Sequence, residues 1–142
     1  MNNKRKINIK AIFIGWLVDT VGTVIAGFII GIIAAVFLAA KDFGADQIAE
    51  ELSNSAAVQK AAIFIEFTLT FIGGYVAALI AKEDEIKHAV LVGVLSLVSS
   101  LIITAAMQQQ DPMMYLVSLF ILPFAVLGGY LKKTTKKEDK VK

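Results

Sequence analysis

Two carboxyl side chains stand inside apolar stretches of the chain. Asp19 is the only charged residue in 11–40, and Glu66 is the only charged residue in 61–81. An ionisable group at membrane depth costs about 2.5 to 3.5 kcal/mol on insertion scales, so it ordinarily faces the interior of a helix bundle. A carboxyl in such a place can hold a proton or a small cation, or it can bond to a hydroxyl and fix the packing of helices.

Hydroxyl side chains recur near these acids at helical spacing. Thr70 follows Glu66 by four residues, and Ser96, Ser100 and Thr104 repeat that spacing in the third apolar segment. Residues four apart lie on one side of a helix, so each set forms a polar row. Rows that face each other would form a polar column leading to Glu66. Two interpretations stay open for this column, namely hydrogen bonding between helices and a site for a proton or small substrate.

The depths of the two acids argue against a direct carboxyl pair. Counted along a helix from the ends of their segments, Asp19 lies ~12 Å deep and Glu66 ~24 Å deep. The other residues offer no catalytic signature, because no nucleophile motif, phosphate loop or metal-ligand spacing occurs in the sequence. We therefore expect no enzyme, no metal, no cofactor and no nucleic-acid partner. His88, the only histidine, is interpreted as a solvated residue at the membrane surface.

The elements that must position these residues are membrane-spanning helices. The chain has 142 residues, of which 57% are hydrophobic, and its mean hydropathy is +0.72. Apolar segments long enough to cross a bilayer predict an all-α bundle of four transmembrane helices in a single domain, 1–142. The predicted spans are 11–40, 61–81, 89–107 and 112–131, followed by a Lys-rich tail at 132–142.

Local signals refine the helices. Pro123 lacks an N–H and is expected to kink the fourth span. The candidate caps for the second span are Ser53, Asn54 and Ser55, and 47–52 is expected to form a short surface helix. Asp111 is expected to cap the fourth span, and the Lys-rich tail is expected to be disordered at its end.

The distribution of basic residues predicts the orientation. Lys and Arg number four in the leader 1–10, two in the turn 82–88 and six in the tail, whereas only Lys41 and Lys60 fall on the other side. Because cytoplasmic segments of membrane proteins carry the excess of Lys and Arg, we expect both termini in the cytoplasm.

Small residues mark the surfaces through which the spans are expected to pack. In the first span Gly27 and Gly31 continue a four-residue row from Asp19, and in the second span Gly74 continues the row of Glu66. Small residues let backbones approach closely in lipid, so we expect these two rows to pack against each other. The full set of predicted packing glycines is Gly27, Gly31, Gly73, Gly74, Gly128 and Gly129.

The segment GGYVAALIAKEDEIKHAVLVGVLSL, at 73–97, resembles the helix, charged turn and helix of small four-span bacterial membrane proteins of unknown function. The resemblance implies a multi-pass protein of the bacterial cell membrane and no particular chemistry. Two function classes follow. One is a non-enzymatic accessory or structural component that forms homo-oligomers or binds a partner membrane protein. The alternative is a small proton-linked transporter or permease subunit that uses Glu66.

Overall fold

The computed structural model describes residues 7–106 and 112–138, and its secondary structure there is entirely helical. The helices are α1 (Ile9–Ala39), α2 (Ala45–Asn54), α3 (Ala56–Ala81), α4 (Glu85–Ala106), α5 (Pro112–Leu119) and α6 (Ile121–Glu138). Four stretches are long and apolar enough to cross a membrane, namely α1, α3, α4 and the bent pair α5–α6. The predicted all-helical architecture with four spans is therefore confirmed.

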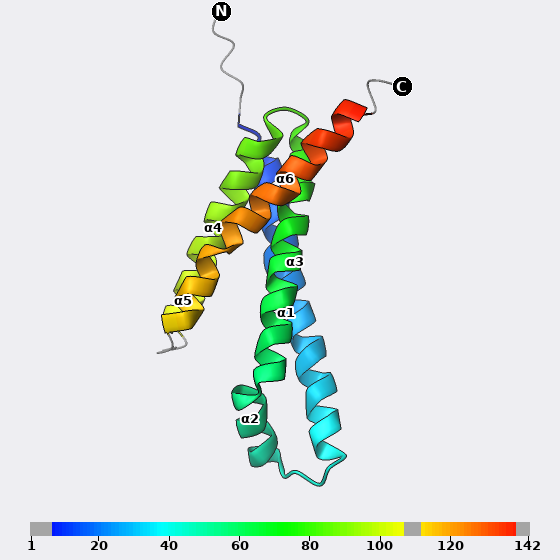
Figure 1. Ribbon diagram of the computed structural model, residues 1–142, viewed down its shortest axis with the longest axis vertical. Helices are drawn as coiled ribbons and strands as arrows, with labels where there is room; N and C mark the ends of the chain where they lie inside the picture. The colour runs from blue at the N-terminus through cyan, green and yellow to red at the C-terminus, as the bar shows by residue number, and fades with distance from the viewer. Residues whose placement is uncertain (1–6, 107–111, 139–142) are drawn as a thin grey trace, which may run out of the picture.

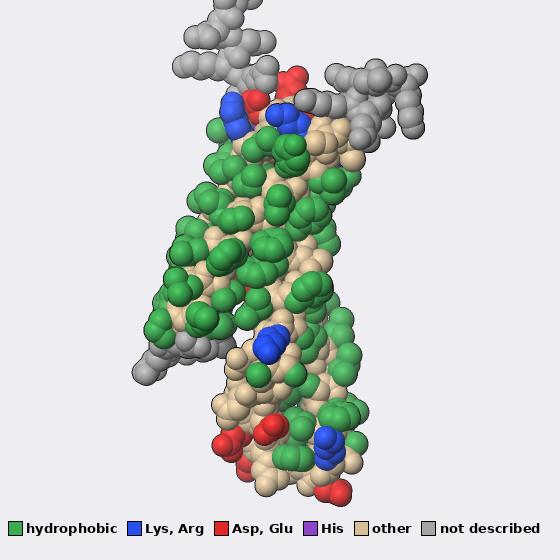
Figure 2. All heavy atoms as spheres, in the orientation of Figure 1, with side chains coloured by type: hydrophobic (Ala, Val, Ile, Leu, Met, Phe, Trp, Pro, Cys, Tyr) green, Lys and Arg blue, Asp and Glu red, His purple; other side chains and the backbone are tan. Residues whose placement is uncertain are grey.

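The spans are arranged around α3, which packs against α1, α4 and α6. Figure 1 shows three features at one end of the bundle, namely the start of α1, the end of α6 and the α3–α4 turn. This end is here called the terminal end. The α1–α3 pair continues beyond α5 at the opposite end, where α2 packs on both of its helices (Figure 1). Figure 2 shows a largely apolar midsection with charged side chains gathered toward the two ends.

Two helices begin earlier than their hydropathy alone indicates. α3 starts at Ala56, where the Ser55 hydroxyl accepts a hydrogen bond from the Val58 N–H at 3.4 Å. α4 starts at Glu85, directly after a tight turn in which Lys82 and Asp84 take positive φ angles of 60° and 49°. Glu, Gln and Lys are good helix formers, so the helices extend through the polar residues that flank the spans.

Three further expectations concern the ends of helices. The expected surface helix at 47–52 exists as the longer α2. The first seven residues of the Lys-rich tail, 132–138, continue α6, so the helix runs past the predicted end of the span. The predicted cap at Asp111 lies outside the described residues.

The interpretation of His88 as solvated is wrong, because its side chain is 3% exposed and packs where α1 begins.

The fourth span is broken at Phe120, between α5 and α6. Pro123 has no N–H for the carbonyl of Leu119, which lies four residues earlier, and its ring crowds that carbonyl. The chain forms a tighter turn there, in which the Phe120 N–H bonds to the Val117 carbonyl at 3.0 Å. The predicted kink is therefore present, and its position follows from the missing hydrogen bond.

Glycines set the distances between the spans. A Cβ added to Gly15 of α1 would lie 2.6 Å from the Gly73 carbonyl oxygen, and one added to Gly73 would lie 2.7 Å from the Gly15 carbonyl oxygen. Added Cβ atoms at Gly74 and Gly128 would collide with backbone of the facing helix, in the α3–α6 contact. Gly129 approaches the Ala89 side chain of α4 in the same way. At these positions no larger residue fits without moving a helix.

The expected contact of Gly27 and Gly31 with the second span is corrected by the structure. A Cβ at either glycine would meet no atom within 4 Å in the part of the chain that the structure describes. Four residues advance 400° around a helix, so a row of fourth residues rotates by about 40° at each step. The row of fourth residues on α1 faces α3 at Gly15. By Gly27 this row has rotated away from α3.

Matched glycine substitutions test this packing. Gly74→Leu is expected to lower the free energy of unfolding by about 3 kcal/mol or to prevent assembly of the bundle, because the added side chain overlaps α6 backbone. Gly27→Leu is expected to leave the unfolding free energy of the monomer unchanged. Reversible unfolding in mixed micelles measures both variants, and equal tolerance of the two substitutions would contradict the α3–α6 contact.

Candidate functional site

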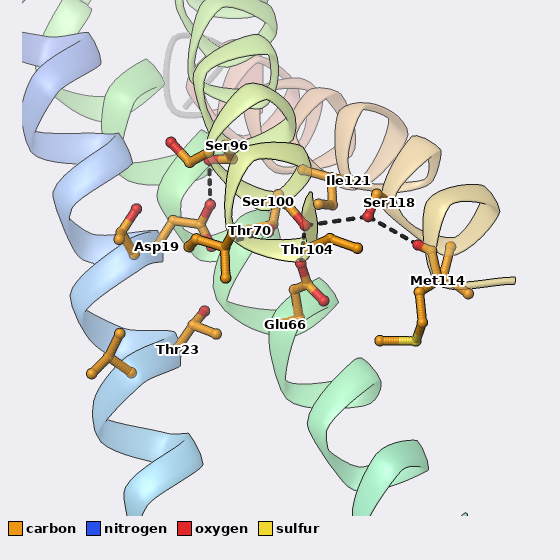
Figure 3. A pocket seen from close by; sticks show the side chains of 15 residues that line it. Asp19, Thr23, Glu66, Thr70, Ser96, Ser100, Thr104, Met114, Ser118 and Ile121 are labelled. Carbon is orange, nitrogen blue, oxygen red and sulfur yellow. Dashed lines mark hydrogen bonds between the residues drawn. The ribbon is translucent and has the colours of Figure 1, made fainter. Parts of the chain in front are cut away.

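A half-open cavity of about 260 Å³ lies between the helices where the α1–α3 pair and the α4–α5 pair diverge (Figure 1). Figure 3 shows acidic and hydroxyl side chains pointing into it from different helices. Its lining consists of Asp19, Thr20, Thr23, Val24, Glu66, Thr70, Ser96, Ser99, Ser100, Ile103, Thr104, Met114, Val117, Ser118 and Ile121. The cavity therefore combines both membrane-depth acids with most of the hydroxyl groups of the spans.

Asp19 occupies the part of the cavity nearest the terminal end, and both of its carboxyl oxygens are engaged. Oδ1 accepts a hydrogen bond from the Thr70 hydroxyl of α3 at 2.9 Å, and Oδ2 accepts one from the Ser96 hydroxyl of α4. The Asp19 side chain is 4% exposed, and Thr70 is fully buried. Asp19 thus joins three helices, and each of its carboxyl oxygens has a hydrogen-bond partner within the protein.

Glu66 lies on α3 one turn before Thr70 and is engaged much less. Among the described residues it accepts one hydrogen bond, from the Ser100 hydroxyl to Oε1, at the long distance of 3.3 Å. Ser100 also contacts the Ser118 hydroxyl at 3.2 Å, and Ser118 donates to the Met114 carbonyl at 3.0 Å. A chain of hydroxyl groups therefore connects the carboxyl of α3 to α4 and α5, and the carboxyl keeps hydrogen-bonding capacity for a ligand.

The charge of the cavity is of one sign. Two carboxyl groups line it, and none of the described lining residues is Lys, Arg or His. Carboxylate and hydroxyl oxygens are acceptors for protons and cations, whereas an anion would find no opposite charge here. Apolar side chains form the rest of the wall, so the site offers an oxygen-rich region beside a hydrophobic one; these side chains are Val24, Ile103, Met114, Val117 and Ile121.

The structure brings together every residue that the sequence marked as a candidate proton or substrate site. These residues are Asp19, Glu66, Thr70, Ser96, Ser100 and Thr104. The two acids share one cavity at different depths, and the described hydrogen bonds tie them to different partners. The partner of Glu66 is Ser100, one turn closer to the terminal end than Thr104, the residue that counting along straight helices places level with it.

Sequence reasoning missed four hydroxyl residues of the cavity, Thr20, Thr23, Ser99 and Ser118. Thr20 and Ser99 lie next to Asp19 and Ser100 in sequence and fall outside the four-residue rows. Ser99 accepts a hydrogen bond from the Trp16 indole N–H at 3.2 Å. Ser118 had one usable signal, because depth counting from the helix ends places 115–118 level with Glu66.

Comparison with known proteins yields no relative. No protein-family model matches the chain, and no curated protein or solved structure matches it. The resemblance seen in 73–97 therefore stays an expectation. The class that the fold defines is a multi-pass helical membrane protein with four spans, and the site adds an acidic intramembrane cavity.

The role of Asp19 as a joint between helices can be tested by a set of variants. Asp19→Ala leaves two buried hydroxyl groups without an acceptor and is expected to cost about 2 to 4 kcal/mol of unfolding free energy. Adding Thr70→Val and Ser96→Ala removes the unpaired hydroxyl groups, so the triple variant is expected to regain part of that loss.

Asp46→Ala, at an exposed position of α2, is the matched control and is expected to change stability by less than about 0.5 kcal/mol. Unfolding in mixed micelles measures all of these variants. A triple variant less stable than Asp19→Ala alone would contradict the assignment of a joint role to these hydrogen bonds.

Proposed function

We propose that this chain is a small proton-linked transporter of the cell membrane, in which Glu66 exchanges a proton for a small cationic solute. The observation that carries the proposal is the contrast between the two acids of one cavity. Both carboxyl oxygens of Asp19 accept hydrogen bonds, whereas Glu66 accepts a single long one among the described residues. The proposal includes cytoplasmic termini, as the basic residues predict, and no enzymatic step.

The size and lining of the cavity support a small organic cation as the solute. A volume of about 260 Å³ corresponds to about nine waters, at roughly 30 Å³ each. A monovalent cation with a short apolar part fits both regions of the wall. Its charge would lie at Glu66 and its apolar part against Met114, Val117 and Ile121.

The proton and the cationic solute compete for the Glu66 carboxyl, and this competition links the movement of one to the movement of the other. A protonated Glu66 is neutral and has little attraction for a cation, whereas the ionised form attracts one strongly in a medium of low dielectric constant. Binding of the solute therefore releases the proton, and protonation releases the solute. The Ser100 hydroxyl can donate to the ionised carboxyl or accept from the protonated one, because a hydroxyl rotates. Asp19 keeps the helices in place during this exchange.

Proton flux in reconstituted vesicles tests the proposal. Tetramethylammonium suits the experiment because it carries a permanent charge and cannot cross the bilayer as a neutral base. A gradient of this cation across vesicles containing the protein is expected to drive proton movement in the opposite direction, read with an internal pH dye. Glu66→Gln keeps the shape of the side chain but cannot titrate, so the flux is expected to fall at least tenfold.

Glu50→Gln is the matched control, since Glu50 is exposed on α2, and it is expected to retain the full flux. Both variants must show the wild-type elution volume and helicity. Wild-type protein that moves no protons under any tetramethylammonium gradient, or a Glu66→Gln variant with wild-type flux, would refute proton-linked transport.

The unpartnered part of α1 favours a second candidate function, that of an accessory or structural component. A Cβ added to Gly27 or Gly31 would lie within 4 Å of no other described element, and Phe28 and Ile32 beside them are 70% and 61% exposed. A GxxxG pair in an apolar helix is typical of parallel helix dimers. In this candidate function the chain forms homo-oligomers through α1.

The oligomeric state separates the two candidates experimentally. The double variant Gly27→Leu with Gly31→Leu removes the small surface without touching the rest of the bundle. If α1 joins copies of the chain, light scattering corrected for detergent is expected to show an oligomer for the wild type and a monomer for the variant. A monomeric wild type at membrane-like protein density would exclude the homo-oligomeric form.

A further inference from the structure

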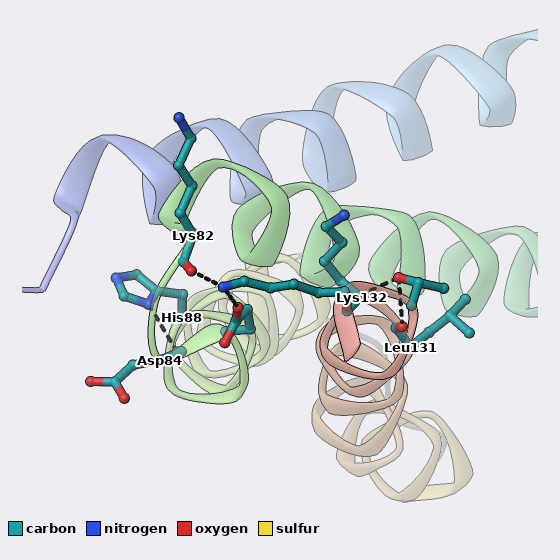
Figure 4. A network of polar contacts seen from close by, with 8 residues as sticks. Lys82, Asp84, His88, Leu131 and Lys132 are labelled. Atoms are coloured by element: carbon teal, nitrogen blue, oxygen red, sulfur yellow. Dashed lines mark hydrogen bonds and ion pairs between the residues drawn. The ribbon is translucent and has the colours of Figure 1, made fainter. Parts of the chain in front are cut away.

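His88 lies at the terminal end of the bundle, where α4 meets the first residues of α1. Its side chain is 3% exposed, and both ring nitrogens have backbone partners. The Asn8 N–H donates to Nε2 at 2.9 Å, and Nδ1 lies 3.1 Å from the Asp84 carbonyl oxygen. Figure 4 shows the ring beside Asp84 in the turn that leads into α4. The imidazole therefore joins the α3–α4 turn to the start of α1.

These two partners define the protonation state of the ring. A carbonyl oxygen only accepts hydrogen bonds, so Nδ1 must carry a hydrogen. A backbone N–H only donates, so Nε2 must have a free lone pair. Only the neutral imidazole with its hydrogen on Nδ1 satisfies both contacts. An imidazolium ion has hydrogens on both nitrogens and would direct one of them at the Asn8 N–H.

We infer that His88 is a proton-operated latch on the start of α1. The neutral ring holds Asn8, which is also the N-cap of α1 because its side-chain oxygen accepts from the Ala11 N–H at 3.1 Å. Protonation converts the acceptor at Nε2 into a donor, and the hydrogen bond to Asn8 is lost. This inference concerns a part of the chain distant from Glu66 and stands whether or not the chain transports a solute.

The latch acts on the contact between α1 and α4. Two other polar contacts link these helices, the Trp16–Ser99 hydrogen bond and the Asp19–Ser96 hydrogen bond at the cavity. The Asn8–His88 hydrogen bond lies closest to the terminal end of the three. Its loss frees the first turn of α1 from α4 while the contacts at the cavity remain.

Ion pairs engage two of the carboxyl groups around this site. Lys87 pairs with the Asp84 carboxylate at 3.2 Å, and Lys136 of α6 pairs with Glu85 and also donates to the Lys82 carbonyl. The described charged residues at this end are Lys10 on α1, Lys82, Glu83 and Asp84 in the turn, Glu85 and Lys87 on α4, and Lys132, Lys133 and Lys136 on α6. The carboxyl groups bonded to Lys87 and Lys136 are thus already paired with cations when His88 gains its charge.

The direction of the pH effect follows from the hydrogen bonds. The latch holds Asn8 while the ring is neutral, and it opens when the pH falls far enough for the ring to gain a proton. Acidification on the terminal side of the membrane is therefore the signal to which α1 responds.

Nuclear magnetic resonance of the full chain in lipid nanodiscs tests the inference directly, because His88 is the only histidine. With ¹⁵N-labelled histidine, the spectrum at pH 8 is expected to show the hydrogen on Nδ1 and none on Nε2. On lowering the pH to 5 the ring is expected to become doubly protonated. The protection factor of the Asn8 amide, corrected for the intrinsic pH dependence of exchange, is expected to fall about tenfold with the loss of one ordinary hydrogen bond.

His88→Gln supplies the control, since an amide side chain can accept from Asn8 and donate to Asp84 but does not titrate. In this variant the Asn8 protection factor is expected to be the same at pH 8 and pH 5. A hydrogen on Nε2 at pH 8, a ring that stays neutral at pH 5, or unchanged protection of Asn8 on protonation would each overturn the latch, and these wild-type measurements do so without any variant.

Discussion

Close approach of backbones along α3 is the constraint on which the rest of this structure depends. Gly73 brings α1 within contact of the α3 backbone on one side, and Gly74 brings α6 within contact on the other. Ala77 and Ala78 continue the same small surface and are almost fully buried. In lipid no hydrophobic force holds helices together, so contact area and hydrogen bonds must do so. The arrangement of the other spans around α3 follows from these few small side chains.

Some polar groups inside the bundle join helices, and others keep free hydrogen-bonding capacity. Asp19, Thr70 and Ser96 satisfy one another across three helices, which makes them part of the framework. Glu66 is one helical turn farther from the terminal end, where the helices diverge, and a single long hydrogen bond reaches it. A carboxyl group can therefore belong to the packing or keep free hydrogen-bonding capacity, and the separation of the helices decides which.

The sequence predicts the spans and the membership of the cavity well, because both depend on periodicity along single helices. Long apolar runs define α1, α3 and α4, and rows of fourth residues collect Glu66, Thr70, Ser96, Ser100 and Thr104 on the inner faces. Periodicity shows which face of a helix is buried. It does not show which other helix packs on that face, because this depends on where the helices cross. For this reason Gly27 and Gly31 were assigned to α3, although the contact forms at Gly15. Burial of His88 likewise depends on the start of α1, eighty residues away in sequence.

The unequal lengths of the spans have a consequence for the surrounding lipid. α1 has 31 residues and α4 has 22, so at ~1.5 Å per residue they measure roughly 46 Å and 33 Å. Both begin at the terminal end, and the excess of α1 carries exposed Ile33, Val36 and Phe37. A bilayer that matches α4 is thinner than α1 requires, and tilt or local thickening relieves such mismatch. The protein thus presents two hydrophobic thicknesses on opposite sides, and membrane thickness becomes a variable that sets its inclination.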